Sequence, residues 1–183
     1  MFLALLALVA CSSTPPVPAG HAFDDASLAP APFSIDELRA YNQAGRSYVF
    51  HSESPGHPTY VRTMTFLEAD ETGATVRSTG GVLNADMPGD RMERKETWAE
   101  LQAHAAYPAD GTTRSWSRVE LPGGPVDCLL YTVDEGEGRR TEACFDLERP
   151  GPPVSLLQAQ DDSLVFHMTL QASSLVSPRP AGH

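Results

Sequence analysis

The segment between Cys128 and Cys144 constrains the fold most, because it has the pattern of a β-hairpin. A β-prone run over 129–133 is followed by the turn-forming sequence 134–138 and by a second strand-like run over 139–147. Side chains alternate between the two faces of a strand, so each run has one apolar and one more polar side. This element therefore indicates an antiparallel sheet.

A turn centred on Gly136 sets the expected register of this hairpin. The expected pairs are Cys128 with Cys144, Asp127 with Phe145, Leu129 with Ala143, and Tyr131 with Thr141. The odd-numbered side is then the core side, with Leu129, Tyr131, Val133, Ala143, Phe145 and Leu147. Both cysteines lie on the other, more polar side.

The rest of the domain is expected to consist mostly of short strands joined by turns. Strand-like segments cover 46–53, 59–69, 74–79, 91–96, 112–121, 154–159 and 163–171. In the last of these, one side is expected to be buried, with Leu164, Phe166, Met168 and Leu170. Residues 80–90 are rich in Gly and Pro and are expected to form a loop.

Two capping boxes predict two short helices, because a Ser or Thr is followed three residues later by Glu at Ser34 and at Thr97. The helices are expected over 34–44 and 97–107. With about eight strands, these elements predict an α+β fold: a mostly antiparallel curved sheet or half-barrel with two short helices. In its order of elements the domain resembles the half-barrel of the lipoprotein-localisation carriers, in which a curved sheet wraps helices.

The first residues have the pattern of an export signal. Residues 2–10 form an apolar run of 9 residues, which has the length of a signal-peptide core and is too short to span a bilayer. The run ends in Leu-Val-Ala-Cys-Ser at 8–12, which resembles the lipobox of bacterial lipoproteins. This resemblance implies cleavage before Cys11 and acylation of its thiol and new amino group. No Lys or Arg precedes the apolar run, which departs from the usual signal.

The same resemblance implies a place in the bacterial cell envelope. The chain as a whole is similar to envelope lipoproteins of Gram-negative bacteria, and by enterobacterial sorting rules Ser12 after the lipidated Cys11 implies the outer membrane. Several acyl chains anchor stably, because each buried CH₂ contributes about 0.8 kcal/mol. The membrane, reached through the lipid anchor, is therefore the first expected partner.

A spacer is expected between the anchor and one folded domain. Residues 12–32 contain five prolines among Ser, Thr, Ala and Gly, and such a segment extends to about 65 Å at about 3.1 Å per residue. We therefore divide the chain into four parts: a signal peptide at 1–10, a lipidated cysteine and tether at 11–32, a single β-rich domain at 33–172, and a flexible tail at 173–183.

The cysteine count agrees with an exported chain. Once Cys11 is lipidated, Cys128 and Cys144 remain as an even pair. Because the expected register places them opposite each other, we predict a structural disulfide, worth about 3 kcal/mol for a loop of this size. The alternative is a redox-active pair, but the sequence has no Cys-x-x-Cys motif.

Charge and motifs exclude several functions. With 13 Lys and Arg against 24 Asp and Glu, the formal net charge is −11. The chain therefore lacks the basic surface that binds nucleic acid or anionic headgroups. His51, Glu53 and His57 flank a turn but fit no zinc spacing, so we expect no metal and no cofactor. No nucleophile elbow or phosphate loop is present, which favours a non-catalytic protein.

Two functional hypotheses fit these observations, and a third fits them less well. In the first, a cavity of several hundred Å³ on the concave sheet face binds an apolar ligand or lipid. Its expected lining is Trp98, Trp116, Tyr131, Phe145, Phe166 and Met168. In the second, these residues form a filled core, and an exposed apolar patch binds an envelope protein. The least favoured is a hydrolase that uses His104 and a carboxylate.

Overall fold

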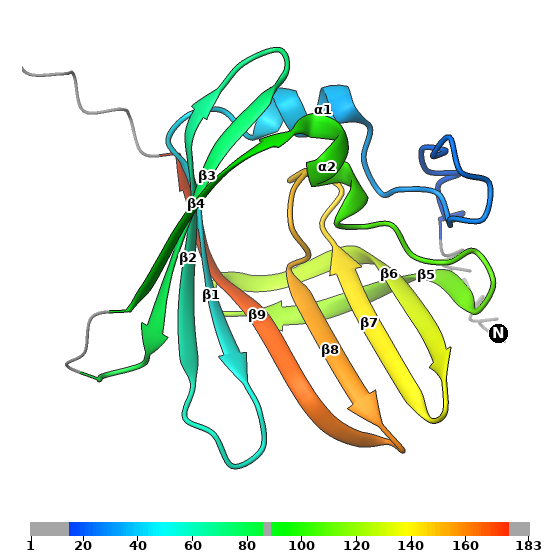
Figure 1. The fold of residues 1–183 in the computed structure, drawn as a ribbon. Helices are drawn as coiled ribbons and strands as arrows, with labels where there is room; N and C mark the ends of the chain where they lie inside the picture. The colour runs from blue at the N-terminus through cyan, green and yellow to red at the C-terminus, as the bar shows by residue number, and fades with distance from the viewer. Residues whose placement is uncertain (1–14, 86–88, 176–183) are drawn as a thin grey trace, which may run out of the picture.

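One curved antiparallel sheet dominates the computed structural model, which describes residues 15–85 and 89–175 (Figure 1). Its nine strands follow the order β4-β3-β2-β1-β9-β8-β7-β6-β5, and β4 and β5 remain as the two edges. The predicted α+β half-barrel with two short helices is confirmed, with nine strands in place of about eight. Within the described residues, no helix has the length and apolar character needed to cross a membrane.

The elements agree closely with the predicted segments. The helices are α1 (Ile35–Tyr41) and α2 (Trp98–Ala103). The strands are β1 (Arg46–Glu53), β2 (Tyr60–Ala69), β3 (Gly73–Val82), β4 (Asp90–Thr97), β5 (Thr112–Leu121), β6 (Gly124–Gly136), β7 (Arg139–Phe145), β8 (Ser155–Gln160) and β9 (Ser163–Leu175). The loop predicted over 80–90 is shorter, because β3 continues to Val82 and β4 begins at Asp90.

Both predicted capping boxes form. The Ser34 hydroxyl accepts a hydrogen bond from the Glu37 amide at 3.2 Å, and the Glu37 carboxylate accepts from the Ser34 amide at 2.7 Å. Thr97 and Glu100 repeat this arrangement at α2. The first helix ends before residue 44, because Asn42 caps it and its amide donates to the last turn.

The β6–β7 hairpin forms, but its predicted register is wrong by two residues. The observed pairs are Leu129 with Phe145, Leu130 with Cys144, and Tyr131 with Ala143. The turn is made by Glu137 and Gly138, whose φ angles of 52° and 75° are those of a two-residue hairpin turn. Glu135 is an extra residue in β6, where the register shifts between Asp134 and Gly136.

A shift of two residues leaves every side chain on its predicted face. The expected core residues Leu129, Tyr131, Val133, Ala143 and Phe145 are all buried, and Leu147 is partly buried.

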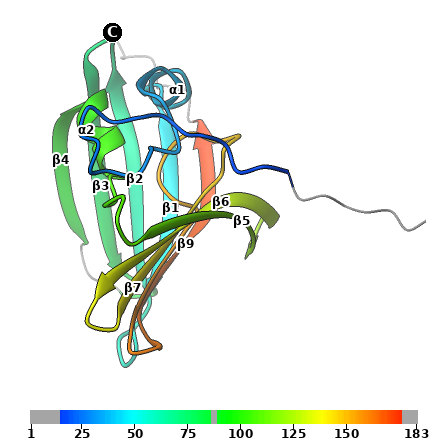
Figure 2. The same cartoon turned by 90° about the vertical axis from the view of Figure 1, so that its right-hand side faces the viewer.

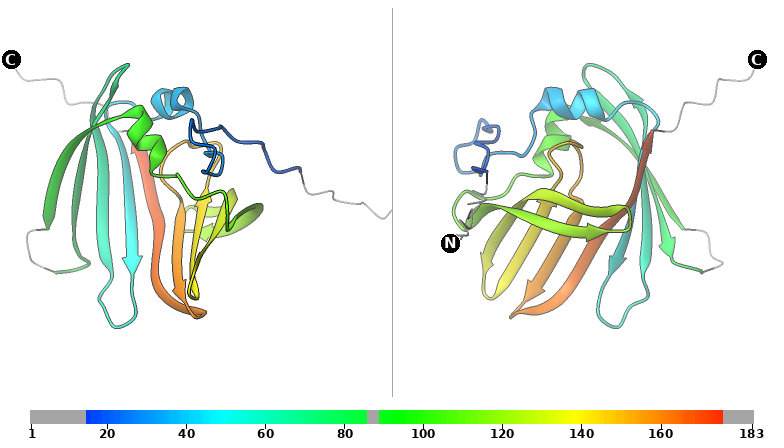
Figure 3. Two further views of the ribbon diagram at one scale, coloured as in Figure 1. Left: turned by 45° about the vertical axis from the view of Figure 1, so that its right-hand side comes forward. Right: turned by 180° about the vertical axis from the view of Figure 1, so that it is seen from behind.

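The predicted disulfide is confirmed, although its two cysteines are diagonal rather than directly opposed. Cys128 and Cys144 are bonded, and their Cα atoms are 5.6 Å apart. Both are buried, which is unlike the polar surface expected for their side of the hairpin. Seen from behind, the β5–β6 hairpin crosses over β7, β8 and β9 on the convex side, and β5 comes into contact with β9 (Figure 3).

The packed part of the chain is longer than the predicted domain at both ends. Ala29 and Ala31, which we assigned to the tether, are buried, and the Ala29 amide donates to the Tyr107 carbonyl at 2.8 Å. At the other end β9 continues to Leu175, which pairs with Arg46 of β1. The expected signal peptide and Cys11 lie outside the described residues.

Candidate binding site on the concave face

The two helices cover only one end of the concave face, as Figure 2 shows from the side. Under them, the Trp98 ring of α2 stacks on Phe66 of β2 with 6.5 Å between centroids. Phe145 packs edge-on against Phe33 at 6.0 Å and against Tyr131 at 5.5 Å. These aromatic contacts fill the covered end.

Three of the six predicted binding residues belong to this core. Trp98, Tyr131 and Phe145 are no more than 2% exposed. The hollow left beside Trp98 and Phe145 has a volume of about 80 Å³, far below the several hundred Å³ that the first hypothesis requires. The covered end is therefore a core rather than a ligand chamber.

The opposite end of the same face is open, and several of its side chains are apolar. Strand pairing places Val82 beside Tyr60, and pairs Ser52 with both Tyr60 and Met168. Leu156 of β8 continues this row. Because directly paired residues share a face, the row crosses five strands on the concave side.

More apolar side chains lie on this face near the row. We define the open apolar patch as Tyr60, Val82, Met92, Phe166 and Met168. Val82 and Met92 are 41% and 50% exposed. Phe166 and Met168, which we predicted to be buried with Leu170, are partly buried. The prediction is wrong for Leu164, which is 43% exposed: β9 has a register shift between Leu164 and Phe166, so Leu164 pairs with Ala159 and lies on the opposite face from Phe166.

Two cations share the face with the patch. Arg62 pairs across the strands with Phe50, and Arg94 pairs with Val76, so both lie on the concave side. Both are exposed, and in the described part of the chain neither forms an ion pair. The protein as a whole has a net charge of −11, but these two arginines give the open end a local positive charge. The open end is therefore suited to an apolar segment that carries acidic residues.

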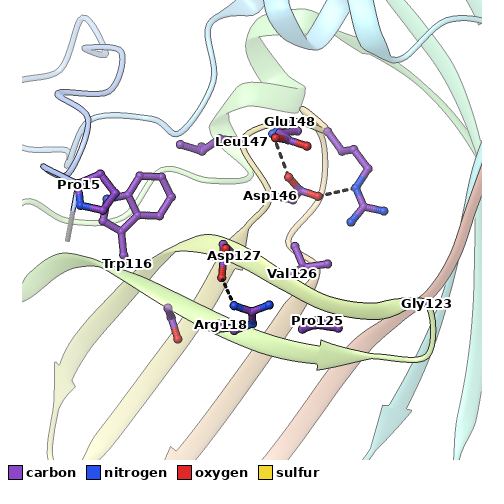
Figure 4. Close-up of a pocket in the computed structure, with 12 residues that line it drawn as sticks. Pro15, Trp116, Arg118, Gly123, Pro125, Val126, Asp127, Asp146, Leu147 and Glu148 are labelled. Carbon is purple, nitrogen blue, oxygen red and sulfur yellow. Dashed lines mark hydrogen bonds and ion pairs between the residues drawn. The ribbon is translucent and has the colours of Figure 1, made fainter. Parts of the chain in front are cut away.

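The sixth predicted binding residue, Trp116, lies elsewhere. It stands on β5 beside an open hollow of about 990 Å³ between the β5–β6 hairpin and the loop after β7 (Figure 4). Arg118 and Asp127 form an ion pair at 3.5 Å across the two strands of this hollow. The structure therefore separates the predicted set into the core, the open apolar patch and this hollow.

The residues considered for catalysis lie on an exposed part of the surface. The imidazole Nε2 of His104 is 3.8 Å from the Glu96 carboxylate, and its side chain is 67% exposed. The hollow beside it is lined by Ala103 and by Arg94, Lys95, Glu96 and Glu100, none of which is a hydrolytic nucleophile of the serine or cysteine type. Across residues 15–85 and 89–175, no three His, Cys, Asp or Glu side chains gather as metal ligands.

Comparison with known proteins gives a fold neighbour. No family model and no curated relative matches the chain. The crystal structure of MucB in complex with MucA(peri) aligns with a TM-score of 0.52 and 14% identity over 81% of this chain. A crystal structure of MucB aligns with a TM-score of 0.52 and 13% identity over 80%.

The chain shares the fold of MucB. It spans 57% and 59% of the two MucB chains, which is less than two thirds of their length. At this identity the likeness concerns the curved sheet and its helices, and it assigns no residue of the open apolar patch.

Sequence reasoning found Phe166 and Met168 but missed three members of the patch. Tyr60 is in phase with the apolar positions of β2, so alternation alone gives its face. Val82 lies in the segment 80–90 that we expected to be a loop, and Met92 lies in a predicted strand for which we expected no apolar face. Leu164 was expected on the face of Phe166, but the register shift in β9 places it on the other face.

Proposed function

We propose that this protein is a non-catalytic, lipid-anchored protein of the bacterial envelope that binds an apolar segment of a partner protein on its open apolar patch. The patch carries the proposal. Its apolar side chains lie on one face of one sheet and are left uncovered by α1 and α2. Apolar surface gathered in this way marks an interaction site more often than scattered exposed residues do.

Two further observations support a protein partner over a carried lipid. The covered end of the concave face is filled, with a hollow of about 80 Å³, whereas an enclosed ligand needs several hundred. The fold neighbour MucB has been crystallised with a protein, MucA(peri). Arg62 and Arg94 on the same face favour a segment with acidic residues beside its apolar ones.

The anchor and the location rest on the lipobox. Cleavage before Cys11 and its acylation give a membrane-attached form, and Ser12 favours the outer membrane. The domain then presents its open apolar patch to proteins within the envelope.

A photo-crosslinking residue at two neighbouring positions tests the proposal. Val82 is 41% exposed and Val61 is partly exposed, but they lie on opposite faces of the sheet, because Val82 pairs with Tyr60 and Val61 pairs with Gly81. We expect a crosslinker at Val82, expressed in cells, to trap a protein, and the same crosslinker at Val61 to trap none. A second concave position, Met92, should trap the same protein.

Matched substitutions give the affinity. Val82→Glu should weaken binding of the trapped protein at least about tenfold, because burying an unpaired carboxylate is costly, and Val61→Glu should leave it unchanged. Equal trapping at positions 82 and 61 would refute the site. A lipid in place of a protein at position 82, seen as a mass adduct, would return the function to an apolar-ligand carrier.

A further inference from the structure

The proline-rich start of the described chain lies against β5, the edge strand of the sheet. The Trp116 indole Nε1 donates a hydrogen bond to the Pro16 carbonyl at 3.3 Å. The Arg114 guanidinium donates to the Ala19 carbonyl at 3.0 Å. Both donors stand on the same face of β5, since they are two residues apart along a strand.

The spacing of these contacts fits a polyproline helix. Such a helix has three residues per turn and rises about 3.1 Å per residue, so the carbonyls of Pro16 and Ala19 point the same way about 9 Å apart. Same-face donors on a strand are about 7 Å apart, and the long arginine side chain covers the difference. Three of the five residues in 15–19 are prolines, which fix φ in the range this helix requires.

The aromatic part of the contact is also present. Pro15 and Trp116 line the same hollow, and Figure 4 shows Pro15 beside the indole ring. Proline-rich segments are commonly recognised in this way, by an aromatic ring and by donors to their carbonyls, because they are ordered before they bind.

A glycine ends the docked segment. Gly20 has a φ of 77°, and a Cβ there would lie 2.7 Å from the Arg114 guanidinium and 2.9 Å from the Ala31 carbonyl oxygen. The chain therefore turns away from β5 at a position where only glycine fits. It then pairs with itself, since His21 and Ala31 exchange two backbone hydrogen bonds.

We propose that Trp116 and Arg114 form a binding site for polyproline-type segments and that Pro15–Ala19 occupies this site in cis. The donors contact backbone carbonyls, so the site selects the extended proline backbone rather than particular side chains. It is distinct from the open apolar patch, and it does not depend on the lipid anchor.

Proteolysis of the full chain measures occupancy of the site. Elastase cleaves after small residues such as Ala19. The Ala19–Gly20 bond should become accessible to the protease only when the segment leaves the site. We expect the double variant Trp116→Phe/Arg114→Gln to be cut there several times faster than the parent. Arg118→Gln is the matched control, because Arg118 stands on the same face of β5 but pairs with Asp127.

The Trp116→Phe change keeps an aromatic ring and removes only the indole donor, so the fold should persist, and the thermal unfolding midpoint checks this. If a folded double variant is cut at the parent's rate, the docked segment is not held by these donors and the proposal fails.

Binding in trans provides an independent test. Replacing Pro15, Pro16 and Pro18 with Gly should empty the site, because the segment loses its preset backbone. A peptide of residues 12–21 should then shift the Trp116 indole resonance in the NMR spectrum of this variant. We expect binding about tenfold weaker to the parent, since the linked segment competes at a high effective concentration.

A control peptide with Gly at the three proline positions should not bind. Equal binding of both peptides, or equal binding of the proline peptide to the emptied chain and to its Trp116→Phe form, would overturn the proposal.

Discussion

Asn42 and Tyr48 form a buried polar pair that ties α1 to the loop before β8. The Tyr48 hydroxyl donates to the Asn42 side-chain carbonyl at 2.5 Å. The Asn42 amide donates to the Leu38 and Pro150 carbonyls, both at 2.9 Å. Each buried group thus has a partner, which is what makes a polar side chain tolerable in a core.

Removing the Tyr48 hydroxyl should destabilise the fold. Tyr48→Phe leaves the Asn42 carbonyl buried without a donor, so we expect the free energy of unfolding to fall by about 1–3 kcal/mol. Urea unfolding followed by circular dichroism measures the change. The control is Tyr41→Phe. Tyr41 is the partly buried last residue of α1, so this change should alter stability by less than about 0.5 kcal/mol.

The buried tyrosines also predict an alkaline limit. Burial raises the pKa of Tyr107 to about 12 and raises that of Tyr48 further. An unfolded tyrosine titrates near pH 10, so above this pH the native state binds more protons than the unfolded one. The contribution of these tyrosines to stability should therefore be constant well below pH 10 and fall as the pH rises toward 12.

Urea midpoints between pH 8 and pH 12 check this, and Tyr107→Phe should flatten the decline. A decline of the same slope in the variant would remove Tyr107 as a cause.

At the scale of elements, the disulfide is the clearest stabilising device. Cys128 and Cys144 close a loop across β6 and β7 with a sequence separation of 16. Replacing both with Ala should lower the free energy of unfolding by about 3 kcal/mol, because the unfolded chain regains the freedom of that loop. Reducing the parent with a thiol should give a similar loss, whereas reduction should not affect the double variant.

The same hairpin shows how far the sequence could determine the fold. Alternation assigned the faces of β6 and β7 correctly, because a register error of two preserves every face. The bulge at Glu135 escaped prediction, since nothing in Asp134–Gly138 distinguishes a bulged strand with a two-residue turn from a longer turn. The capping boxes did locate both helices, because the hydrogen bonds of a capping box join residues only three positions apart and so depend on local sequence alone.

The candidate site was less predictable than the fold. Phe166 and Met168 were assigned to the concave face from alternation alone. Whether that face is core or surface depends on where α1 and α2 lie over it, which is a tertiary property. Trp98 and Phe166 therefore looked equivalent in the sequence, although one is 2% exposed and the other lies at the uncovered end.

At the scale of the whole molecule, the docked proline segment and the proposed anchor together set the height of the domain above the membrane. From Cys11 to Pro16 the chain has five peptide steps, which span at most about 18 Å. With the segment released, the free chain from Cys11 to Gly20 has nine peptide steps, which extend to about 28 Å at about 3.1 Å per residue, because the chain from His21 to Ala31 stays packed on the domain. Docking at Trp116 would thus hold the open apolar patch near the bilayer, and release would let it reach partners farther away.

Energy transfer on vesicles measures this height. The lipidated protein, labelled at the exposed Glu120 with a donor dye, is reconstituted into vesicles that contain an acceptor lipid. We expect Trp116→Phe/Arg114→Gln to lower transfer relative to the parent and to Arg118→Gln, because the released spacer moves the dye away from acceptors. Cys11→Ser should abolish transfer altogether by removing the anchor. Transfer that persists in Cys11→Ser would contradict the anchor, whereas equal transfer in the double variant and the parent would contradict docking as the control of height.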